Sequence, residues 1–218
     1  MRILALDTAT AATVVALLDT HSGLSVEARD DPPPRARPAH ASRLLGLIES
    51  LLAGSGGWAR VDRIAVGVGP GTFTGLRIGV ATAQGLALAR GCPIVAVSTL
   101  DSLAAAAHGV AVAQGREALA VIDARRGEVF LGGPGVPAAV RGPGQLAPEA
   151  DGRLAVGDGA VQFREALVAA GAMVPDPDSP LHRVNGLEHC RLAERAQPQP
   201  PQSIQPLYLR VPDAELTA

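Results

Sequence analysis

Two glycine-rich segments of the 218-residue chain resemble each other, and this likeness constrains the fold more than any other feature of the sequence. Residues 63–69 read RIAVGVG and residues 153–159 read RLAVGDG, so five of the seven positions are identical. Each segment has the apolar character of a buried strand, and a helical pattern follows each one. The same order of elements around both copies indicates an internal duplication. The chain is therefore predicted to fold as two related halves.

The first half is predicted to begin with three strands. Residues 2–7 are apolar throughout, 13–18 are rich in β-branched side chains, and 23–28 alternate between apolar and polar. Turn-type residues separate the three runs, which is typical of an antiparallel meander. A proline-rich loop at 30–38 follows. The remaining expected elements are a helix at 40–52, a strand at 62–68, a helix at 74–90 and a strand at 93–97.

The second half repeats this order with shorter elements. Its expected elements are strands at 119–123, 128–131, 136–140 and 153–159 and helices at 161–170 and 187–196, with irregular chain at 171–183 and 197–206. Two βββαβα halves describe an α/β, two-lobed actin/Hsp70-like (ASKHA) fold built from ribonuclease H-like halves. We expect a partner-binding N-terminal lobe over 1–102. A reduced C-terminal lobe is expected over 103–218, with its last segment packing back on the first lobe.

Composition excludes several classes of function. All 19 basic residues are arginine, so a P-loop lysine, a Schiff-base lysine and a Ser–Lys dyad are absent. A net charge of −2 and 2% aromatic residues give no general reason to bind or stack on nucleic acid. Cys92 and Cys190 form no CxxC pair and are expected to be free thiols. Neither a signal peptide nor a membrane span is recognisable, so a cytoplasmic protein is expected.

Two aspartates, Asp7 and Asp123, end the first strands of the two halves, where the actin-like architecture can carry a phosphate-proximal carboxylate. Residues 67–77, GVGPGTFTGLR, place a glycine-rich turn between a buried strand and a helix, and Thr72 or Thr74 can cap that helix. A helix N-terminus favours anions. In the alternative interpretation, the aspartates cap turns and the glycines only satisfy a tight turn. The candidate nucleotide- or phosphate-proximal residues are Asp7, Thr8, Gly69, Gly71, Thr72, Thr74, Gly75, Arg77 and Asp123.

The two predicted helices of the first half have the features of a contact surface. Small residues recur every fourth position in the helix at 74–90, and such a stripe lets two helix backbones approach closely. The helix at 40–52 has an apolar arc wider than one buried face requires. The opposite interpretation is that the small stripe packs on the chain's own sheet. The candidate partner-interface residues are His40, Leu44, Leu47, Ile48, Leu51, Gly75, Gly79, Ala83 and Ala87.

Metal-dependent and triad catalysis have little support. The five histidines form no HxxxH or HExxH pair, and adjacent His189 and Cys190 do not have the spacing of a closed zinc site, so no metal ligands are expected. Ser98, Asp101 and His108 could form a triad, but no nucleophile elbow surrounds the serine. The charged segment at 123–128 is interpreted as an ordinary hairpin end.

Five segments occur in the order typical of one family: ILALDTAT, GVGPGTFTGLRIGVATAQGLALA, VSTLDSLA, VIDARRGEVF and PLYLRVPDAEL. On these segments the chain resembles the TsaB (YeaZ) family, which is accessory to making threonylcarbamoyladenosine (t6A) on tRNA. The resemblance covers 1–130 and 206–216, and GPGTFTGLR is its most specific part. It implies an actin/Hsp70-like fold and a paralogue of TsaD, the catalytic transferase.

The resemblance also implies a non-catalytic role. Thr99 and Leu103 occupy the positions where TsaD-like proteins carry the two histidines of a metal-binding HxxxH motif. The implied partners are TsaD and TsaE, with tRNA joining through the complex and a homodimer forming when the chain is alone. No cofactor is implied for the isolated chain, whereas ATP or ADP and a metal are expected in the partner complex. The alternatives are an ATP-dependent kinase-like enzyme of the same fold and, more remotely, a metalloprotease.

Overall fold

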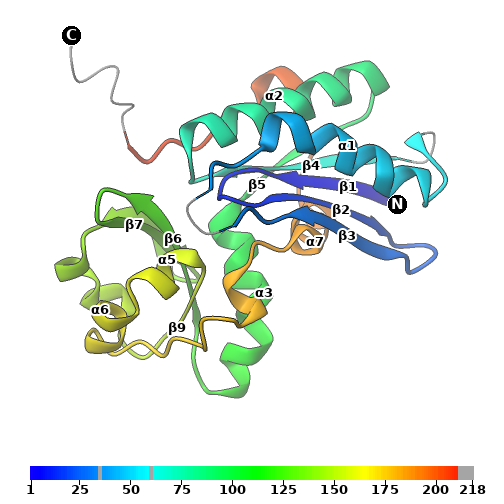
Figure 1. Cartoon of the computed structure of the whole chain (residues 1–218). Coiled ribbons are helices and arrows are strands. Elements are labelled where there is room, and N and C mark those ends of the chain that lie inside the picture. The colour runs from blue at the N-terminus through cyan, green and yellow to red at the C-terminus, as the bar shows by residue number, and fades with distance from the viewer. Residues whose placement is uncertain (34–35, 59–60, 211–218) are drawn as a thin grey trace, which may run out of the picture. The chain divides into compact units, whose positions relative to one another are not determined.

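The computed structural model describes residues 1–33, 36–58 and 61–210 (Figure 1). The chain divides into two compact units. The first unit combines Met1–Thr99 with Asn185–Leu207, and the second combines Leu100–Val184 with the described residues 208–210. In the described part of the chain, no helix is long and apolar enough to cross a membrane.

The first unit is built on a five-stranded sheet in the order β3-β2-β1-β4-β5. Neighbouring strands are antiparallel through β3, β2 and β1, and parallel through β1, β4 and β5. All six residues of β1 are buried, as expected for a central strand covered on both faces. The strands are β1 (Arg2–Asp7), β2 (Thr13–Asp19), β3 (Ser25–Asp30), β4 (Arg63–Gly69) and β5 (Ile94–Ser98).

Helices cover both faces of this sheet. Helices α1 (His40–Ala53) and α2 (Phe73–Arg90) lie on one face, and α7 (Gly186–Arg195) lies on the other (Figure 1). Because side chains alternate along a strand, β1 contributes residues to the hydrophobic cores on both faces of the sheet. Its Leu4 and Leu6 belong to the core that includes buried residues of α1 and α2, whereas its Ile3 and Ala5 pack with residues of α7.

The segment after α7 also packs on the first unit. Gln199 forms an antiparallel bridge to Ile94 of the edge strand β5. The Gln84 side chain of α2 donates to the carbonyls of Pro201 and Ile204, both at 2.9 Å. The division of the chain therefore differs from a single boundary between 102 and 103, because Asn185–Leu207 joins the first unit. The final residues of the expected packing-back segment, 211–218, lie outside the described residues.

The second unit contains a four-stranded sheet in the order β8-β7-β6-β9. Strands β8, β7 and β6 form an antiparallel meander, and β9 pairs with β6 in parallel. Its strands are β6 (Ala118–Arg125), β7 (Glu128–Gly133), β8 (Val136–Arg141) and β9 (Leu154–Val156). Its helical elements are α3 (Thr99–Ala113), η2 (Pro143–Gln145), α4 (Ala147–Ala150), α5 (Asp158–Gln162), α6 (Arg164–Ala169) and η3 (Pro180–His182).

The expected fold class is confirmed. Each unit has an antiparallel meander extended by parallel pairing at its first strand, as an actin-like duplication requires. Three details were predicted wrongly. The helix α3 was not recognised, the strand expected at 153–159 is only Leu154–Val156, and the helix expected at 161–170 is two short helices that meet at Phe163.

Candidate functional site

The end of β1 and the start of α2 meet in a tightly packed corner, the β1–α2 corner, made of residues 7–9 and 71–75. The Thr8 hydroxyl donates to the Gly75 carbonyl at 2.7 Å, and the Thr72 N–H donates to the Ala9 carbonyl at 2.8 Å. A Cβ added at Gly75 would collide with the Thr8 carbonyl oxygen, and one at Gly71 with that of Ala9. The glycines of this motif therefore allow close approach of two backbone segments.

The corner presents only some of the polar groups that the phosphate hypothesis names. Thr8 is fully buried. Thr72 is the N-cap residue of α2 but makes no side-chain capping hydrogen bond, so the expected hydroxyl cap was wrong. Thr74 is exposed, and the Arg77 guanidinium stacks over the Phe73 ring at 3.8 Å from its centroid. Gly69 is buried with a φ of 101°, a conformation suited to glycine.

Asp7 is buried inside the first unit rather than exposed at a turn. Its carboxylate accepts hydrogen bonds from the Ala9 N–H at 2.7 Å and the Thr99 hydroxyl at 2.8 Å. The His189 Nε2 of α7 lies 3.0 Å from Asp7 Oδ2. Burial opposes ionisation, but the hydrogen bond and charge of His189 lower the pKa of Asp7 below its usual value. With only 1% of its surface exposed, Asp7 has no face open to a phosphate in this conformation.

Asp123, the equivalent residue of the second unit, has different surroundings. Its carboxylate pairs with the Arg125 guanidinium at 3.1 Å and accepts from the Arg125 N–H at 2.8 Å. The Arg125 side chain is 66% exposed but that of Asp123 is only 6% exposed, so the pair joins a largely buried carboxylate to a surface guanidinium. The backbone N–H of Asp123 donates to Asp158 at the start of α5. Asp7 belongs to the first unit and Asp123 to the second.

The residues expected to contact a partner are buried in the first unit's own core. His40, Leu44, Ile48, Leu51, Ala83 and Ala87 are each at most 8% exposed, Gly75 and Gly79 are buried, and Leu47 is half-buried. A Cβ at Gly79 would collide with the Thr8 hydroxyl, so the small stripe of α2 packs on the end of β1. The intramolecular alternative therefore holds for the stripe. These side chains support α1 and α2 from beneath and offer no open surface.

A different face of α1 and α2 is exposed and largely uncharged. Leu88 on α2 is 64% exposed and Leu45 on α1 is 52% exposed. Ala81, Gly85 and Ala89 of α2 are also exposed. Apolar groups gathered on the solvent side of adjacent helices are a feature of interaction sites. We call these five residues the α1–α2 outer face.

The other predicted catalytic groups do not assemble. Asp101 and His108 are exposed on α3, two turns apart, which is about 10 Å along the axis. Thr99 is buried and donates to Asp7, and Leu103 is buried. Among the described residues, no group of three or more His, Cys, Asp and Glu could hold a metal. Cys92 and Cys190 are free, and burial raises the pKa of the Cys190 thiol to about 12.

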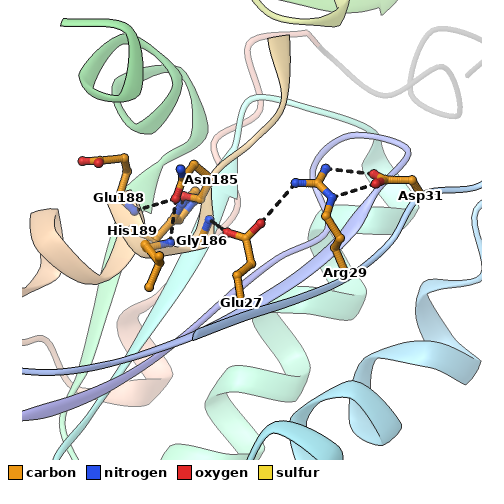
Figure 2. A network of polar contacts seen from close by, with 8 residues as sticks. Glu27, Arg29, Asp31, Asn185, Gly186, Glu188 and His189 are labelled. Carbon is orange, nitrogen blue, oxygen red and sulfur yellow. Dashed lines mark hydrogen bonds and ion pairs between the residues drawn. The ribbon is translucent and has the colours of Figure 1, made fainter. Parts of the chain in front are cut away.

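The polar network around α7 was missed by sequence reasoning. Figure 2 shows Glu27 of β3 reaching the start of α7, with Arg29 and Asp31 beyond it. Glu27 accepts from the Gly186 N–H at 2.7 Å and pairs with Arg29 at 3.2 Å. His189 belongs to the same network and binds Asp7. The one available signal was Asn185, a strong N-cap residue two positions before the helix predicted at 187–196.

Comparisons with known proteins place the chain in a family. A family model described as tRNA N6-adenosine threonylcarbamoyltransferase, TsaD, matches residues 32–137. An uncharacterized protein of Mycobacterium tuberculosis is 32% identical over 223 residues, covering 98% of this chain and 93% of its own length. YeaZ from Pseudomonas aeruginosa is 32% identical, with a TM-score of 0.73 over 95% of this chain and 99% of its own. This chain belongs to the TsaB/YeaZ family.

Two curated relatives named TsaB match a shorter part of the chain at higher identity. The tRNA threonylcarbamoyladenosine biosynthesis protein TsaB of Escherichia coli is 44% identical over 131 residues, or 60% of this chain. The protein of the same name from Haemophilus influenzae is 40% identical over 132 residues. The chain spans about half the length of these two relatives, 53% and 52% respectively.

Proposed function

We propose that this TsaB/YeaZ chain is a non-catalytic subunit required for threonylcarbamoylation of tRNA adenosine next to the anticodon. The names of the curated relatives support a place in t6A biosynthesis. The proposal of a non-catalytic role rests on Thr99 and Leu103, which occupy the positions of the two metal-binding histidines of TsaD-like proteins. Both are buried, and a leucine cannot bind the metal that the histidine pair of TsaD-like proteins would hold.

The α1–α2 outer face is the proposed docking surface for TsaD. Its exposed leucines and small residues supply apolar area without a lysine or a run of charges. The buried residues of α1 and α2 hold these helices firmly on the sheet, so the face is preorganised for binding. TsaE and tRNA join through the complex, which works in the cytoplasm. The same face forms a homodimer when TsaD is absent.

Nucleotide chemistry belongs to the complex in this proposal. Asp7 already accepts three hydrogen bonds and is neutralised by His189, so it is not available to a magnesium-bound phosphate. ATP or ADP and the metal are expected in the TsaD-containing assembly. A kinase-like enzyme of the same fold would instead need an open carboxylate at this position. ATP turnover by the isolated chain would favour that alternative.

The test is binding of purified TsaD from the same organism by the full chain, measured by calorimetry. Leu88→Glu and Leu45→Glu each place a charge on the outer face and should weaken binding at least tenfold. Val168→Glu is the matched control, because Val168 is 53% exposed on α6 of the second unit. Binding of both leucine variants with unchanged affinity would contradict the proposed surface. Loss of t6A synthesis in a reconstituted reaction should follow the loss of binding.

A further inference from the structure

Helix α7 is fixed to the first unit by charged and polar contacts at its start. The Asn185 side chain accepts from the Leu187 and Glu188 N–H groups at 2.9 and 3.2 Å, which caps the helix. Glu27 of β3 accepts from the Gly186 N–H at 2.7 Å (Figure 2). Gly186 also lies so close to β2 that an added Cβ would be 2.8 Å from the Cβ of Ala16. The start of α7 is therefore held in one defined position against the sheet.

His189 lies between two hydrogen-bond acceptors. Its Nε2 is 3.0 Å from Asp7 Oδ2, and its Nδ1 is 3.1 Å from the Asn185 carbonyl oxygen. A neutral imidazole carries only one N–H, whereas the imidazolium carries two. Only the protonated ring can donate to both acceptors. The two acceptors therefore favour a charged His189.

Asp7 continues this chain of contacts into the β1–α2 corner. Asp7 Oδ1 accepts from the Ala9 N–H at 2.7 Å, and the Ala9 carbonyl accepts from the Thr72 N–H at the start of α2. Thr8, which lies between them, donates to Gly75 within α2. Each link connects groups that are buried or at a tight turn. The orientation of the Asp7 carboxylate thus bears directly on where α2 begins.

We infer that His189 is a positioning residue, which as a buried imidazolium fixes Asp7 and, through Asp7, the β1–α2 corner that supports the TsaD-binding face. This inference rests on the proposed function for the part that concerns TsaD. It assigns the C-terminal helix α7 a role in a surface on the opposite face of the sheet. The role is carried by one continuous set of hydrogen bonds within the first unit.

The charges around His189 favour its protonated form. Burial opposes the charge, but the hydrogen bond and the negative charge of Asp7 raise the pKa of His189, assisted by the Asn185 carbonyl and by Glu27. Other titratable groups on the packed elements include His40 of α1, whose pKa is lowered by burial, and Arg29 of β3, which pairs with Glu27. On α7 itself, Glu188 pairs with Arg191, and the helix also carries Cys190, Glu194 and Arg195. His189 should therefore hold the corner at neutral pH and release it as pH rises through the raised pKa.

The first experiment measures the protonation of His189 directly. In the wild-type full chain, the imidazole nitrogen shifts should show both nitrogens protonated at pH 7, with titration above the usual histidine value of about 6.5. The exposed His108 provides the internal comparison. A neutral His189 at pH 7 would overturn the inference. This measurement needs no variant and is independent of TsaD.

The second experiment measures hydrogen-exchange protection and TsaD affinity in His189→Gln, with His108→Gln as the control. Protection factors at the Ala9 and Thr72 amides should fall at least tenfold in His189→Gln alone, while β6 and β7 stay unchanged. The affinity for TsaD should fall in the same variant, and the affinity of the wild type should weaken at alkaline pH.

Unchanged protection factors at the Ala9 and Thr72 amides would overturn the inference. If the protection factors fall but His189→Gln binds TsaD with wild-type affinity, the link between His189 and the α1–α2 outer face is overturned. Absence of TsaD binding by the wild type overturns the proposed function, and the protection factors then still decide the role of His189 in the corner.

Discussion

The ends of β1 and β6 occupy equivalent positions in the two halves but differ in what surrounds their aspartates. Asp7 is fully buried and held by the buried His189 of α7, whereas the largely buried carboxylate of Asp123 pairs with the mostly exposed Arg125 of its own strand. After the glycine-rich strands, the first unit has the 18-residue α2 and the second has the 5-residue α5. A duplicated framework has thus been developed into a rigid helical layer in one copy and shortened in the other.

The comparison teaches that equivalent residues need not keep equivalent roles. A carboxylate in a hydrogen-bonded, buried pair contributes to one fixed arrangement of the elements around it. The pair of Asp123 with Arg125 contributes less, because the Arg125 guanidinium is mostly exposed and its charge is screened by water and salt. The first copy therefore uses its aspartate to join three elements, β1, α7 and the start of α3.

Breaking the buried pair should have the largest effect on this comparison. His189→Ala or Asp7→Ala leaves one buried charge without its partner, and we expect a loss of about 3–5 kcal/mol in the free energy of unfolding. Asp123→Ala should cost less, about 1–3 kcal/mol, because the Arg125 side chain that it leaves behind is mostly exposed. Urea unfolding at pH 7 measures all three. If Asp7→Ala and Asp123→Ala reduced the free energy of unfolding equally, the distinction between the ends of β1 and β6 would be lost.

Glycines of α2 provide a smaller and more local test. Gly75→Ala forces a Cβ against the Thr8 carbonyl and should destabilise the first unit by about 1–3 kcal/mol. Gly85→Ala, with nothing within 4 Å of its added Cβ, should stabilise the helix by up to about 1 kcal/mol. Thermal unfolding gives both values. A stabilising Gly75→Ala would contradict the close approach at the corner.

The dependence of stability on pH should distinguish the same two ends. The folded-state pKa of His189 is raised, so its contribution is complete below about 6.5 and is lost as pH rises through the folded value. The pKa of Asp7 is lowered, so its contribution is lost as pH falls below about 3.8. The stability of the wild type should therefore decline as pH rises above about 6.5. Asp123→Ala should show the same decline, whereas a flat profile for the wild type would argue against the charged pair.

The smallest expected effect concerns the outer face. Leu88→Glu and Val168→Glu change exposed side chains, so each should alter the free energy of unfolding by less than about 0.5 kcal/mol. Urea unfolding of the two variants provides the check. A large loss for Leu88→Glu would show that its effect on TsaD binding reflects folding rather than contact.

Hydrophobic pattern alone predicts most of the strands of the first unit and its helices α1 and α2. Strong periodicity and glycine or proline boundaries coincide in these segments. Helix α3 lacks such contrast, since its residues are mainly alanine and valine and both faces look alike. The break at Phe163 leaves no glycine or proline to mark it. Local patterns also do not say which sheet α7 packs on, because that depends on contacts with residues more than 150 positions earlier.

The candidate site was predicted in position but not in environment. The motif at 67–77 correctly indicates a strand, a tight turn and a helix, and Asp7 does lie beside it. The sequence does not reveal that His189 neutralises Asp7, because the two are 182 residues apart. The small stripe of α2 fits either an internal or an external neighbour, and only the packing against Thr8 distinguishes them.

The return of Asn185–Leu207 to the first unit affects how the protein is made. Ile3 and Ala5 of β1 are synthesised well before the helix that covers them, because Leu100–Val184 of the second unit lies between β5 and α7 in the sequence. At about 5–20 residues per second, this apolar sheet face waits roughly 5–20 s for its cover after β5 is complete. During that interval the nascent chain presents a surface that a chaperone can recognise, so co-translational protection should matter more here than for a lobe that is continuous in sequence.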